Sequence, residues 1–390
     1  MLIRLSNTPR DYAWGSTTMI AELEGREPSG RPEAEVWFGD HPGAPARVED
    51  GTGRTLDDVL GAEKLPFLLK LLAAASPLSI QAHPSIAQAR EGFAREDAAG
   101  VPRDAGHRNY RDDNHKPEVI VALRDGFEAL AGLRDLPATL RLLEGLGEAA
   151  SPLRDRLDVA SPDASLRAAI GWLLSGEAQD EVDAVIAAAT TAAVPGFTAE
   201  LAVARRLADA APGDPGIVVA LLMNLVTLAA GEAVFVRAGA LHAYLGGLGV
   251  EIMSASDNVL RGGLTPKHVD VTELLAVLDT TTGPAGILAP VAEGAGILRF
   301  APPVSDFALL RIDASSAGAV PLDGPAIALC TAGRVTVRGA GGAEISLEPG
   351  QAAFASVEES PLQVSGGGDL FLAEPGATPD RAPGDAVSAP

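Results

Sequence analysis

The spacing of hydrophobic and polar positions first divides the N-terminal third of the chain into short predicted elements. The apolar pieces MLIRL and EVWFG lie among Pro/Gly turns, which predicts irregular β structure up to about residue 50. Residues 55–75 have helical spacing that is interrupted by Pro66. Further on, LSI before Pro84 predicts a short strand, a turn-rich polar loop follows, and VIVAL predicts a buried strand.

From about residue 125 to 228 the pattern changes to a helical period, in segments separated by SP, PG and PGDPG loops. These Ala/Leu-rich segments are LPATLRLLEGL, ASLRAAIGWLLSG, QDEVDAVIAAATTAA, FTAELAVARRLADAA and GIVVALLMNLVTLA. They predict a helical domain of about 100 residues, inserted between two β-rich parts. Because this domain contains no His, Lys or Cys, we expect it to support or cover a functional site and not to perform chemistry.

Strand patterns return after the helical region, where VFV leads through a Gly turn to His242. The final third contains the alternating segments FALLRID, AIALCTAG, RVTVRG, AEISLEPG, LQVSGG and DLFLA. A weak internal echo matches GEAVF, from Gly231, with GQAAF, from Gly350, and in each copy a turn precedes a strand. This echo predicts two related β-barrel or jelly-roll modules. The tail from about residue 376 is rich in Pro, Ala, Asp and Gly, and we predict that it is disordered.

Composition and charge limit what such a chain does. With 390 residues and 47% hydrophobic content it can bury a large core, and its size predicts two or three domains. The formal net charge of −22 argues against general binding to nucleic acid or to anionic membranes, so an anionic substrate needs a local basic pocket. Without a signal-peptide pattern or an apolar run of membrane-spanning length, we expect a cytoplasmic protein. The single cysteine, Cys330, excludes an intrachain disulfide and a Cys-rich metal site.

The rare lysines and tyrosines gather in two polar segments. Only four of the 30 cationic residues are lysines, and the chain has three tyrosines. Lys116 and Tyr110 share one segment, whereas Lys267 and Tyr244 share the stretch HAYLGGLGVEIMSASDNVLRGGLTPK, which begins at His242. A lysine retained in an arginine-rich chain indicates a role that needs a compact charge with a tunable pKa. The density of polar side chains in the second stretch predicts an active-site wall.

Four residues from three separate segments form a suitable metal shell. Gln81 and His83 lie two apart in a predicted strand and therefore project from the same face. Glu118 begins the buried strand after Pro117, where it can face a cavity, and His242 follows the VFV turn. Two imidazoles, a carboxylate and an amide oxygen suit a borderline divalent ion such as Zn²⁺, with water or substrate completing the coordination. Taken singly, however, a histidine is more often a structural, hydrogen-bonded residue than a ligand.

The same segments carry a family resemblance. SIQAHP, YRDDNHKPE and the long stretch that begins at His242 closely resemble the signatures of type I phosphomannose isomerases, the zinc-dependent mannose-6-phosphate isomerases of the cupin superfamily. YAWGS and EVWFGDHP resemble that family's N-terminal segments, and the similarity runs in order from about residue 3 to 270. Departures are few: Ser254 and Gly262 replace the usual alanines, and Ser85-Ile86 follow His-Pro where a polar residue and a lysine are common.

The resemblance implies a mainly β fold with an α insertion. A cupin or jelly-roll catalytic β domain would comprise residues 1–124 and 229–290, with the Ala/Leu-rich helical domain, residues 125–228, inserted in it. A C-terminal cupin-like β domain would follow at residues 291–375, and residues 376–390 would form the tail. The resemblance also favours a monomer.

The implied reaction is the reversible isomerisation of mannose 6-phosphate and fructose 6-phosphate, in which a proton moves between C2 and C1 through an enediolate. One Zn²⁺ per chain is the implied cofactor. By resemblance its ligands are the four residues that the donor chemistry also selects, namely Gln81, His83, Glu118 and His242. The partner implied is a small sugar phosphate, without nucleic acid or membrane.

The implied catalytic residues lie beside these ligands in the sequence. Glu251 is the first choice for the proton shuttle, with Lys116 and His115 as rivals for proton transfer and ring opening. Arg261 can stabilise developing negative charge without losing its own proton. The implied substrate contacts are Lys70, Tyr244, Asp257, Thr265 and Lys267, of which the two lysines, supported by Thr265, suit the phosphate group. The alternative for Lys267 is an ordinary surface position at a helix start after Pro266.

Two other classes of function agree with parts of the pattern. Another cupin metalloenzyme acting on a sugar or sugar phosphate, such as an oxygenase or epimerase, would use a similar His/Glu shell. That class leaves the run from Arg261 to Lys267 and the NHKPE segment unexplained. A non-catalytic sugar-phosphate-binding cupin would hold metal and ligand without turnover. A coupled assay with mannose 6-phosphate on metal-loaded protein distinguishes the three.

Overall fold

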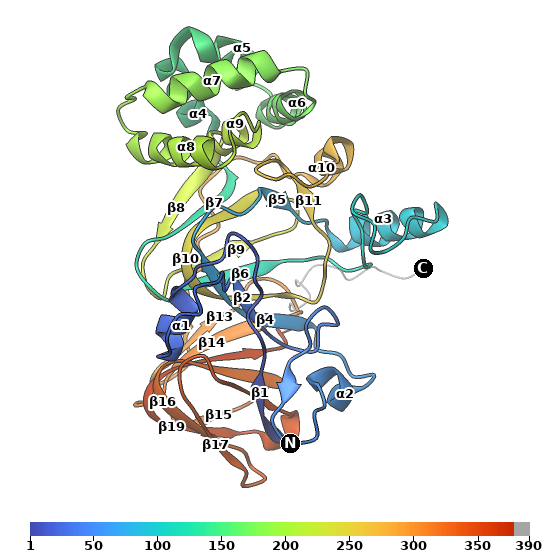
Figure 1. Cartoon of the computed structure of the whole chain (residues 1–390), viewed down its shortest axis with the longest axis vertical. Coiled ribbons are helices and arrows are strands. Elements are labelled where there is room, and N and C mark those ends of the chain that lie inside the picture. Colours follow the sequence, from blue (N-terminus) through green and yellow to red (C-terminus); the bar gives the residue numbers. More distant parts are fainter. Residues whose placement is uncertain (378–390) are drawn as a thin grey trace, which may run out of the picture.

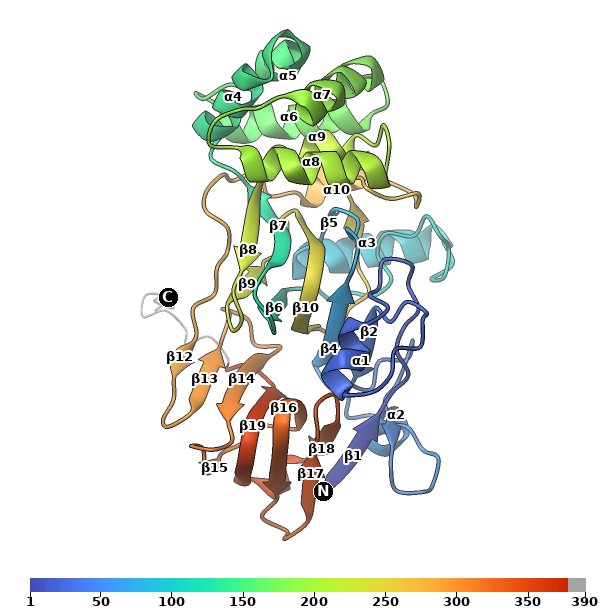
Figure 2. The ribbon, with the colours of Figure 1, turned by 60° about the vertical axis from the view of Figure 1, so that its left-hand side comes forward.

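Three parts follow one another along the long axis of the chain, in a computed structural model that describes residues 1–377 (Figure 1). A group of helices lies at one end, a nine-stranded sheet in the middle and a ten-stranded sheet at the other end, as the second view in Figure 2 also shows. Within residues 1–377 no helix has the length and apolar character needed to cross a membrane. Apart from its first two residues, the tail predicted to be disordered from residue 376 lies outside the described residues.

The middle sheet is built around β10 (His242–Ser254), which is buried over most of its length. The first part of β10 pairs with β5 and β7 and the second part with β4 and β6, always antiparallel. The other strands are β2 (Glu35–Phe38), β4 (Phe67–Ala74), β5 (Gln81–Ala82), β6 (Glu118–Ala122), β7 (Phe127–Leu133), β8 (Met223–Leu228), β9 (Ala233–Val236) and β11 (Leu260–Arg261). The predicted strands VIVAL and VFV are thereby confirmed.

The helical spacing over residues 55–75 led to a wrong prediction for its second half. Helix α2 (Leu56–Leu60) is short, and the run FLLKLLAA is the strand β4. All eight residues of β4 are buried between β2 and β10, so apart from Lys70 the strand is apolar on both faces and lacks the alternation that marks a half-exposed strand. A continuous apolar run cannot be assigned to helix or strand by its period alone.

The prediction of a polar loop after Pro84 is also wrong for the first part of that segment. Residues Ile86–Ala98 form helix α3, whose N-cap Ser85 accepts from the Gln88 backbone N–H while the Gln88 side chain accepts from Ser85. This capping box begins immediately after His83-Pro84, so the helix fixes the chain just beyond the histidine. The Ser-x-x-Gln pattern was the available signal.

The helical group confirms most of the predicted helices. It contains α4 (Leu136–Gly145), α5 (Ser151–Arg154), α6 (Pro162–Leu174), α7 (Gln179–Thr191), α8 (Thr198–Ala210) and α9 (Gly216–Ala220), with a 3₁₀ turn at Gly147–Ala150. In α8 the buried residues Leu201, Ala204 and Leu207 recur at intervals of three residues, as on one face of a helix.

Both ends of the span 125–228 are strands, which corrects the helix predicted for GIVVALLMNLVTLA. Only its first residues form α9, and its second half forms β8, which pairs with β7 from Phe127↔Leu228 to Leu133↔Met223. The helices therefore rise from a pair of neighbouring strands of the middle sheet (Figure 1). That connection places the end of α8 over the sheet.

The ten-stranded sheet has the order β12-β13-β14-β19-β16-β18-β1-β3, with β15 and β17 paired to β19 and β16. Its strands are β1 (Leu2–Ser6), β3 (Arg47–Val48), β12 (Val291–Ala292), β13 (Ile297–Phe300), β14 (Ala308–Asp313), β15 (Ala319–Val320), β16 (Ala326–Arg338), β17 (Glu344–Leu347), β18 (Ala352–Ala355) and β19 (Leu362–Glu374). Thus the N-terminal strand β1 pairs with C-terminal strands, although the sequence grouped it with the catalytic part.

Two pairs of predicted short strands are single long strands. AIALCTAG and RVTVRG together form β16, with a bulge between Cys330 and Ala332, and LQVSGG and DLFLA together form β19. The internal echo is confirmed at the level of local structure, because Gly231 and Gly350 have φ of 86° and 84° and precede β9 and β18.

The two sheets share one hydrophobic core. Leu69 of β4 and Val250 of β10 belong to the same buried cluster as Phe354 of β18 and Phe371 of β19. The remaining helices, α1 (Met19–Glu24), α10 (Val271–Val277) and a 3₁₀ turn at Val357–Glu359, lie between strands in the chain. This packing gives β10 a fixed position, which the functional site requires.

Candidate active site

A cleft of about 750 Å³ opens on the middle sheet. Its walls come from the N-terminal loops, the segment after β4, the loop before β6, the end of α8 and the segment that contains Arg261 and Lys267. A smaller chamber of about 60 Å³ shares Lys70, Gln81 and Lys116 with the cleft, and adds Glu118, His242, Tyr244 and Glu251 to its lining. Polar residues from segments far apart in the sequence therefore meet in one hollow.

Two histidines and a carboxylate face one another beside this chamber. The ligand atoms of His83, Glu118 and His242 all lie within 4.8 Å of one another. Nε2 of His83 is 3.2 Å from Oε1 of Glu118, and Nε2 of His242 is 3.3 Å from Oε2. All three side chains are buried, and His83 is fully inaccessible. The geometry confirms that these residues, predicted from three segments, lie together.

The hydrogen bonds of the His83 and His242 rings leave both side chains suited to bind a cation. Nδ1 of His83 lies 2.7 Å from the Asn258 carbonyl oxygen, and Nδ1 of His242 lies 3.3 Å from that of Ala240. Each carbonyl fixes the proton on Nδ1 and leaves the Nε2 lone pair directed at Glu118. Burial lowers the pKa of His83 to about 4, so the ring is neutral near pH 7, and its Nε2 has no hydrogen-bond partner within residues 1–377. Two lone pairs opposed to a carboxylate fit a divalent cation between them.

Gln81 adds an amide to this group. It pairs with His242 across β5 and β10 and lines the chamber with Glu118. Its amide nitrogen donates to the Ser79 hydroxyl at 3.2 Å, which leaves the amide oxygen as its electron-pair donor. Lys116 completes the surroundings, with Nζ 2.8 Å from Glu118. Although burial opposes ionisation, Lys116 holds the pKa of Glu118 well below its usual range.

A second buried charged pair lies deeper along β10. Nζ of Lys70 is 2.9 Å from Oε2 of Glu251 and 3.7 Å from Oε1 of Glu35. Lys70 and Glu251 are directly opposite each other in the β4–β10 pairing, and only 6% and 3% of their surfaces are exposed. Burial raises the pKa of Glu251, and Lys70 opposes that change. A carboxyl group of this kind is more basic than an exposed glutamate and is shielded from bulk water.

Tyr244 remains a hydrogen-bond donor in this chamber. Its hydroxyl donates to Oε2 of Glu118 at 3.5 Å, and burial raises the pKa of the phenol well above its ordinary value. The phenol is therefore neutral across the range in which proteins function.

Three cations gather in the wall of the cleft without carboxylate partners. In the part of the chain that the structure describes, Arg111, Arg261 and Lys267 form no ion pair. Burial and the neighbouring Arg111 lower the pKa of Arg261, and burial followed by Arg261 and Arg111 lowers the pKa of Lys267. Cations that lower one another's pKa and lack ion-pair partners are suited to bind an anion. We refer to these three residues as the cationic cluster.

The comparisons with known proteins agree with this geometry. A family profile described as "Phosphomannose isomerase type I, catalytic domain" matches residues 2–136. The mannose-6-phosphate isomerase of Escherichia coli strain K12 is 38% identical over 387 residues, which cover 94% of this chain and 98% of that protein. The chain belongs to the type I phosphomannose isomerase family.

More distant family members and solved structures extend the likeness. The mannose-6-phosphate isomerase of Bos taurus is 31% identical over 411 residues and covers 91% of this chain. The crystal structure of mannose 6-phosphate isomerase from Salmonella typhimurium bound to fructose 6-phosphate and zinc has a TM-score of 0.87 and 36% identity, covering 96% of this chain and all of that one. A zinc-bound holo structure has the same TM-score at 35% identity.

One residue that the sequence predicted to be catalytic lies apart from the others. His115 does not line the cleft or the chamber, and its Nε2 lies 3.0 Å from Asp306 in the loop before β14. Its neighbour Lys116 lines both cavities. Successive residues of an extended segment point to opposite sides, so only one of the pair can face the site.

The remaining predicted contacts lie in the cleft wall. Asp257 lies 3.2 Å from His41, as an ion pair when that ring is protonated, and Thr265 contributes its hydroxyl to the Lys267 backbone N–H at 3.1 Å. Lys267 is exposed, as a surface position would be, but it also lines the cleft. Sequence reasoning missed Arg111 and Glu35, and Trp14 and Trp37 also line the cleft.

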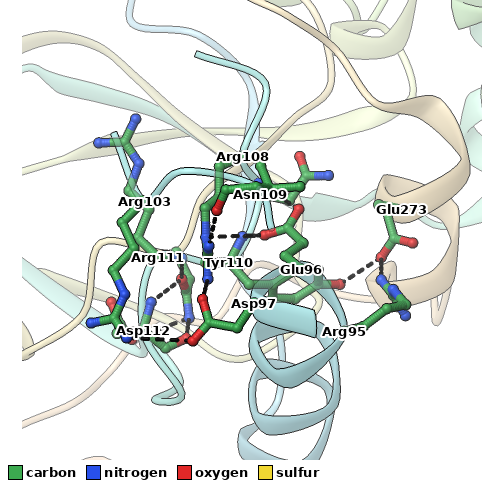
Figure 3. Close-up of polar contacts among 12 residues, drawn as sticks. Arg95, Glu96, Asp97, Arg103, Arg108, Asn109, Tyr110, Arg111, Asp112 and Glu273 are labelled. Atoms are coloured by element: carbon green, nitrogen blue, oxygen red, sulfur yellow. Dashed lines mark hydrogen bonds and ion pairs between the residues drawn. The ribbon is translucent and has the colours of Figure 1, made fainter. Parts of the chain in front are cut away.

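A polar network holds the segment that carries Arg111 (Figure 3). The Glu96 carboxylate on α3 accepts the backbone N–H groups of Asn109 and Tyr110 at 3.0 and 2.9 Å. The Tyr110 hydroxyl donates to Glu273 on α10 at 2.9 Å. Two helices thereby fix the residues immediately before Arg111, which explains how an exposed arginine keeps a defined position.

Asn258 joins this segment to the histidine site. Its side-chain oxygen accepts the backbone N–H groups of Arg111 and Asp112 at 2.7 and 3.2 Å, while its backbone carbonyl faces Nδ1 of His83. Asn258 is fully buried. A single residue therefore orients both a histidine beside Glu118 and part of the cationic cluster.

Proposed function

We propose that this chain is a zinc-dependent mannose-6-phosphate isomerase that interconverts mannose 6-phosphate and fructose 6-phosphate. The observation that carries the proposal is the buried His83, Glu118 and His242 group beside a cleft whose wall contains the cationic cluster. A metal group alone would suit many hydrolases or oxygenases. Its combination with an anion site in one cleft suits a phosphorylated substrate, and relatives of this function match over nearly the whole chain.

Gln81, His83, Glu118 and His242 are the proposed ligands of one Zn²⁺. The donors are two imidazole nitrogens, an ionised carboxylate and an amide oxygen, which fit this ion without thiolates. When bound, the ion supplies a Lewis acid for the sugar's O1 and O2 oxygens. Lys116 holds Glu118 ionised, and the carbonyls of Asn258 and Ala240 orient the two rings.

Glu251 is the proposed base for proton transfer between the two carbon atoms. Its carboxylate would take the proton from C2 of mannose 6-phosphate and return it to C1, because a base beside both carbons serves each direction of the reaction. Its burial prevents the carried proton from exchanging freely with water, and Lys70 holds the group in place. Lys116 is the rival that lines the same chamber, whereas His115 faces Asp306.

The proposed role of the cationic cluster is to bind the negatively charged groups of the substrate. Arg261 is opposite Gln81 in the β11–β5 pairing, beside a proposed ligand, and is suited to stabilise an enediolate oxygen. Lys267 and Arg111, with Thr265, would hold the phosphate, and Asp257 and Tyr244 would contact sugar hydroxyls. Lys70, predicted as a phosphate contact, is bound to Glu251 instead, so we propose it as a partner of the base.

The predicted division into a catalytic β domain at residues 1–124 and 229–290, a helical domain at residues 125–228 and a C-terminal β domain at residues 291–375 is retained as a proposal. The cupin assignment of the two β domains, the monomeric state and the cytoplasmic location are part of it. The pairing of β1 with β18 makes the two β parts interdependent.

Metal removal is the first test of the proposed function. Chelation should abolish isomerisation of mannose 6-phosphate, and added Zn²⁺ should restore it, because the proposed polarisation of the sugar's oxygens would be lost. The measurement is a coupled assay that detects fructose 6-phosphate. Full turnover by metal-free protein would remove zinc from the mechanism, and metal-loaded protein without turnover would favour a sugar-phosphate-binding protein or a different cupin enzyme.

Neutralising the cationic cluster should weaken substrate binding. Lys267→Met and Arg111→Met are each expected to raise KM for mannose 6-phosphate about tenfold, which corresponds to the loss of one charge-assisted hydrogen bond. Steady-state kinetics measure the effect. Lys64→Met removes an exposed lysine that pairs with Asp57 outside the cleft, and it should leave KM unchanged. A KM equal to that of the wild type in all three variants would mean that the phosphate binds elsewhere.

A further inference from the structure

The chain between Arg261 and Lys267 contains a turn with an unusual backbone. Leu264 has φ of 56° and is the one non-glycine residue with positive φ in residues 1–377, and the preceding Gly263 has φ of 112°. A leucine rarely adopts this left-handed conformation, because its Cβ crowds the backbone. Such a conformation persists only where neighbouring contacts hold it, and it is concentrated at functional sites.

A carboxylate from the helical group holds this turn. Oδ1 of Asp214, in the loop between α8 and α9, accepts the backbone N–H groups of Leu264 at 2.9 Å and Gly216 at 2.7 Å. Oδ2 accepts the N–H of Thr265 at 3.2 Å. A Cβ on Gly216 would lie 2.6 Å from the Leu264 nitrogen, so the two backbones are in direct contact.

The turn forms part of the cleft wall. It begins at Arg261, whose strand is paired with β5, and it ends at Lys267, whose backbone N–H donates to the Thr265 hydroxyl. Leu264 and Thr265 line the cleft, as does Leu207 on α8. The Asp214 carboxylate thus connects the helical group to the turn that lies between two residues of the cationic cluster, Arg261 and Lys267.

From these contacts we propose that Asp214 is a positioning residue for the substrate's phosphate group. It fixes the turn of Leu264 and Thr265, and this turn holds Lys267 close to Arg261 and Arg111 before substrate arrives. The inference rests on the proposed function, because it takes the cationic cluster as the phosphate site.

The physical need for such a residue follows from the charges. Three unpaired cations repel one another, so the exposed Lys267 would move away from Arg261 unless its backbone were fixed. Asp214 directs its oxygens at backbone N–H groups and forms no ion pair with the cluster within residues 1–377, so it fixes the turn while leaving the cations free for the phosphate. A preformed site does not lose binding energy in ordering Lys267.

The test uses zinc-loaded, full-length protein with substitutions at Asp214. Asp214→Ala should raise KM for fructose 6-phosphate, and the Kd of inorganic phosphate measured by calorimetry, by the same factor of about ten, since binding must then order the turn and Lys267. Its kcat should stay within about twofold, because the proton-transfer residues are untouched. Asp214→Asn keeps one acceptor oxygen and should give a smaller rise in both constants, and it serves as the test if Asp214→Ala does not fold.

Glu200→Ala is the matched control. Glu200 lies on α8 and, like Asp214, links the helical group to the rest of the protein, through Arg134 at 3.2 Å, but it does not touch the turn. It should lower the thermal midpoint without changing KM or the Kd of phosphate. An equal rise in KM in this variant, or an Asp214→Asn variant with unchanged KM and Kd, would overturn the proposal. Wild-type protein that binds phosphate but does not isomerise the sugar would count against the proposed function instead.

Discussion

Replacing Glu251 by glutamine is expected to lower kcat by about 10²- to 10⁴-fold, the usual contribution of a general acid or base, and to change KM by only a few-fold. Glutamine has the same shape, so the packing of β10 against β4 is preserved, but an amide cannot accept the C2 proton. The loss should appear in both directions of the reaction. Steady-state kinetics measure it, and the kinetic isotope effect with mannose 6-phosphate deuterated at C2 tests the proton-transfer step directly.

The control for this variant must separate loss of the base from loss of a partner for Lys70. Glu35→Gln removes the other carboxylate near Lys70, at 3.7 Å, without removing the proposed base, and should have a much smaller effect on kcat. Equal losses in the two variants would mean that the charge on Lys70 is what matters. A near-wild-type kcat in Glu251→Gln would pass the role to Lys116, which lines the same chamber.

The residues with rare chemistry were predictable from the sequence because few alternatives exist for them. His83, Glu118 and His242 were selected by donor type and by motif, and the structure brings their ligand atoms within 4.8 Å. Choosing between His115 and Lys116 was also within reach. In the extended segment before β6, Lys116 and Glu118 are two apart and share a side, so His115 must face away.

Residues whose role depends on distant partners were not predictable in this way. Arg111 is one of many arginines in the sequence. Its place in the cleft wall depends on two distant residues: Glu96 binds the segment just before it, and Asn258 accepts its backbone N–H. Asp214 lies in a PGDPG loop, a pattern that predicts a turn but not the turn of Leu264, fifty residues later, to which it binds. Strand β4 was misassigned for a related reason. Its largely apolar run fits a helix or a strand, and only its pairing with β2 and β10 decides for a strand.

Replacing His83 by glutamine should remove bound zinc and lower kcat by about 10³-fold or more, the equivalent of several kcal/mol of charge stabilisation in the transition state. This variant is preferable to one at Glu118, because loss of that carboxylate would leave Lys116 buried without its partner and would destabilise the fold. Zinc content is measured by elemental analysis of purified protein. The wild-type thermal midpoint should also fall on chelation, since a ligand bound only by the folded state stabilises it, whereas the variant should not respond.

The matched control is His115→Gln, which replaces a histidine close to the site but turned towards Asp306. It should retain one zinc per chain, the response to chelation and most of the activity, since its ring lines neither cavity. Zinc content in His83→Gln equal to that of the wild type would exclude His83 as a ligand. If His115→Gln instead lost activity with its zinc intact, Glu251 would not be the only residue needed for proton transfer, and His115 would be its rival.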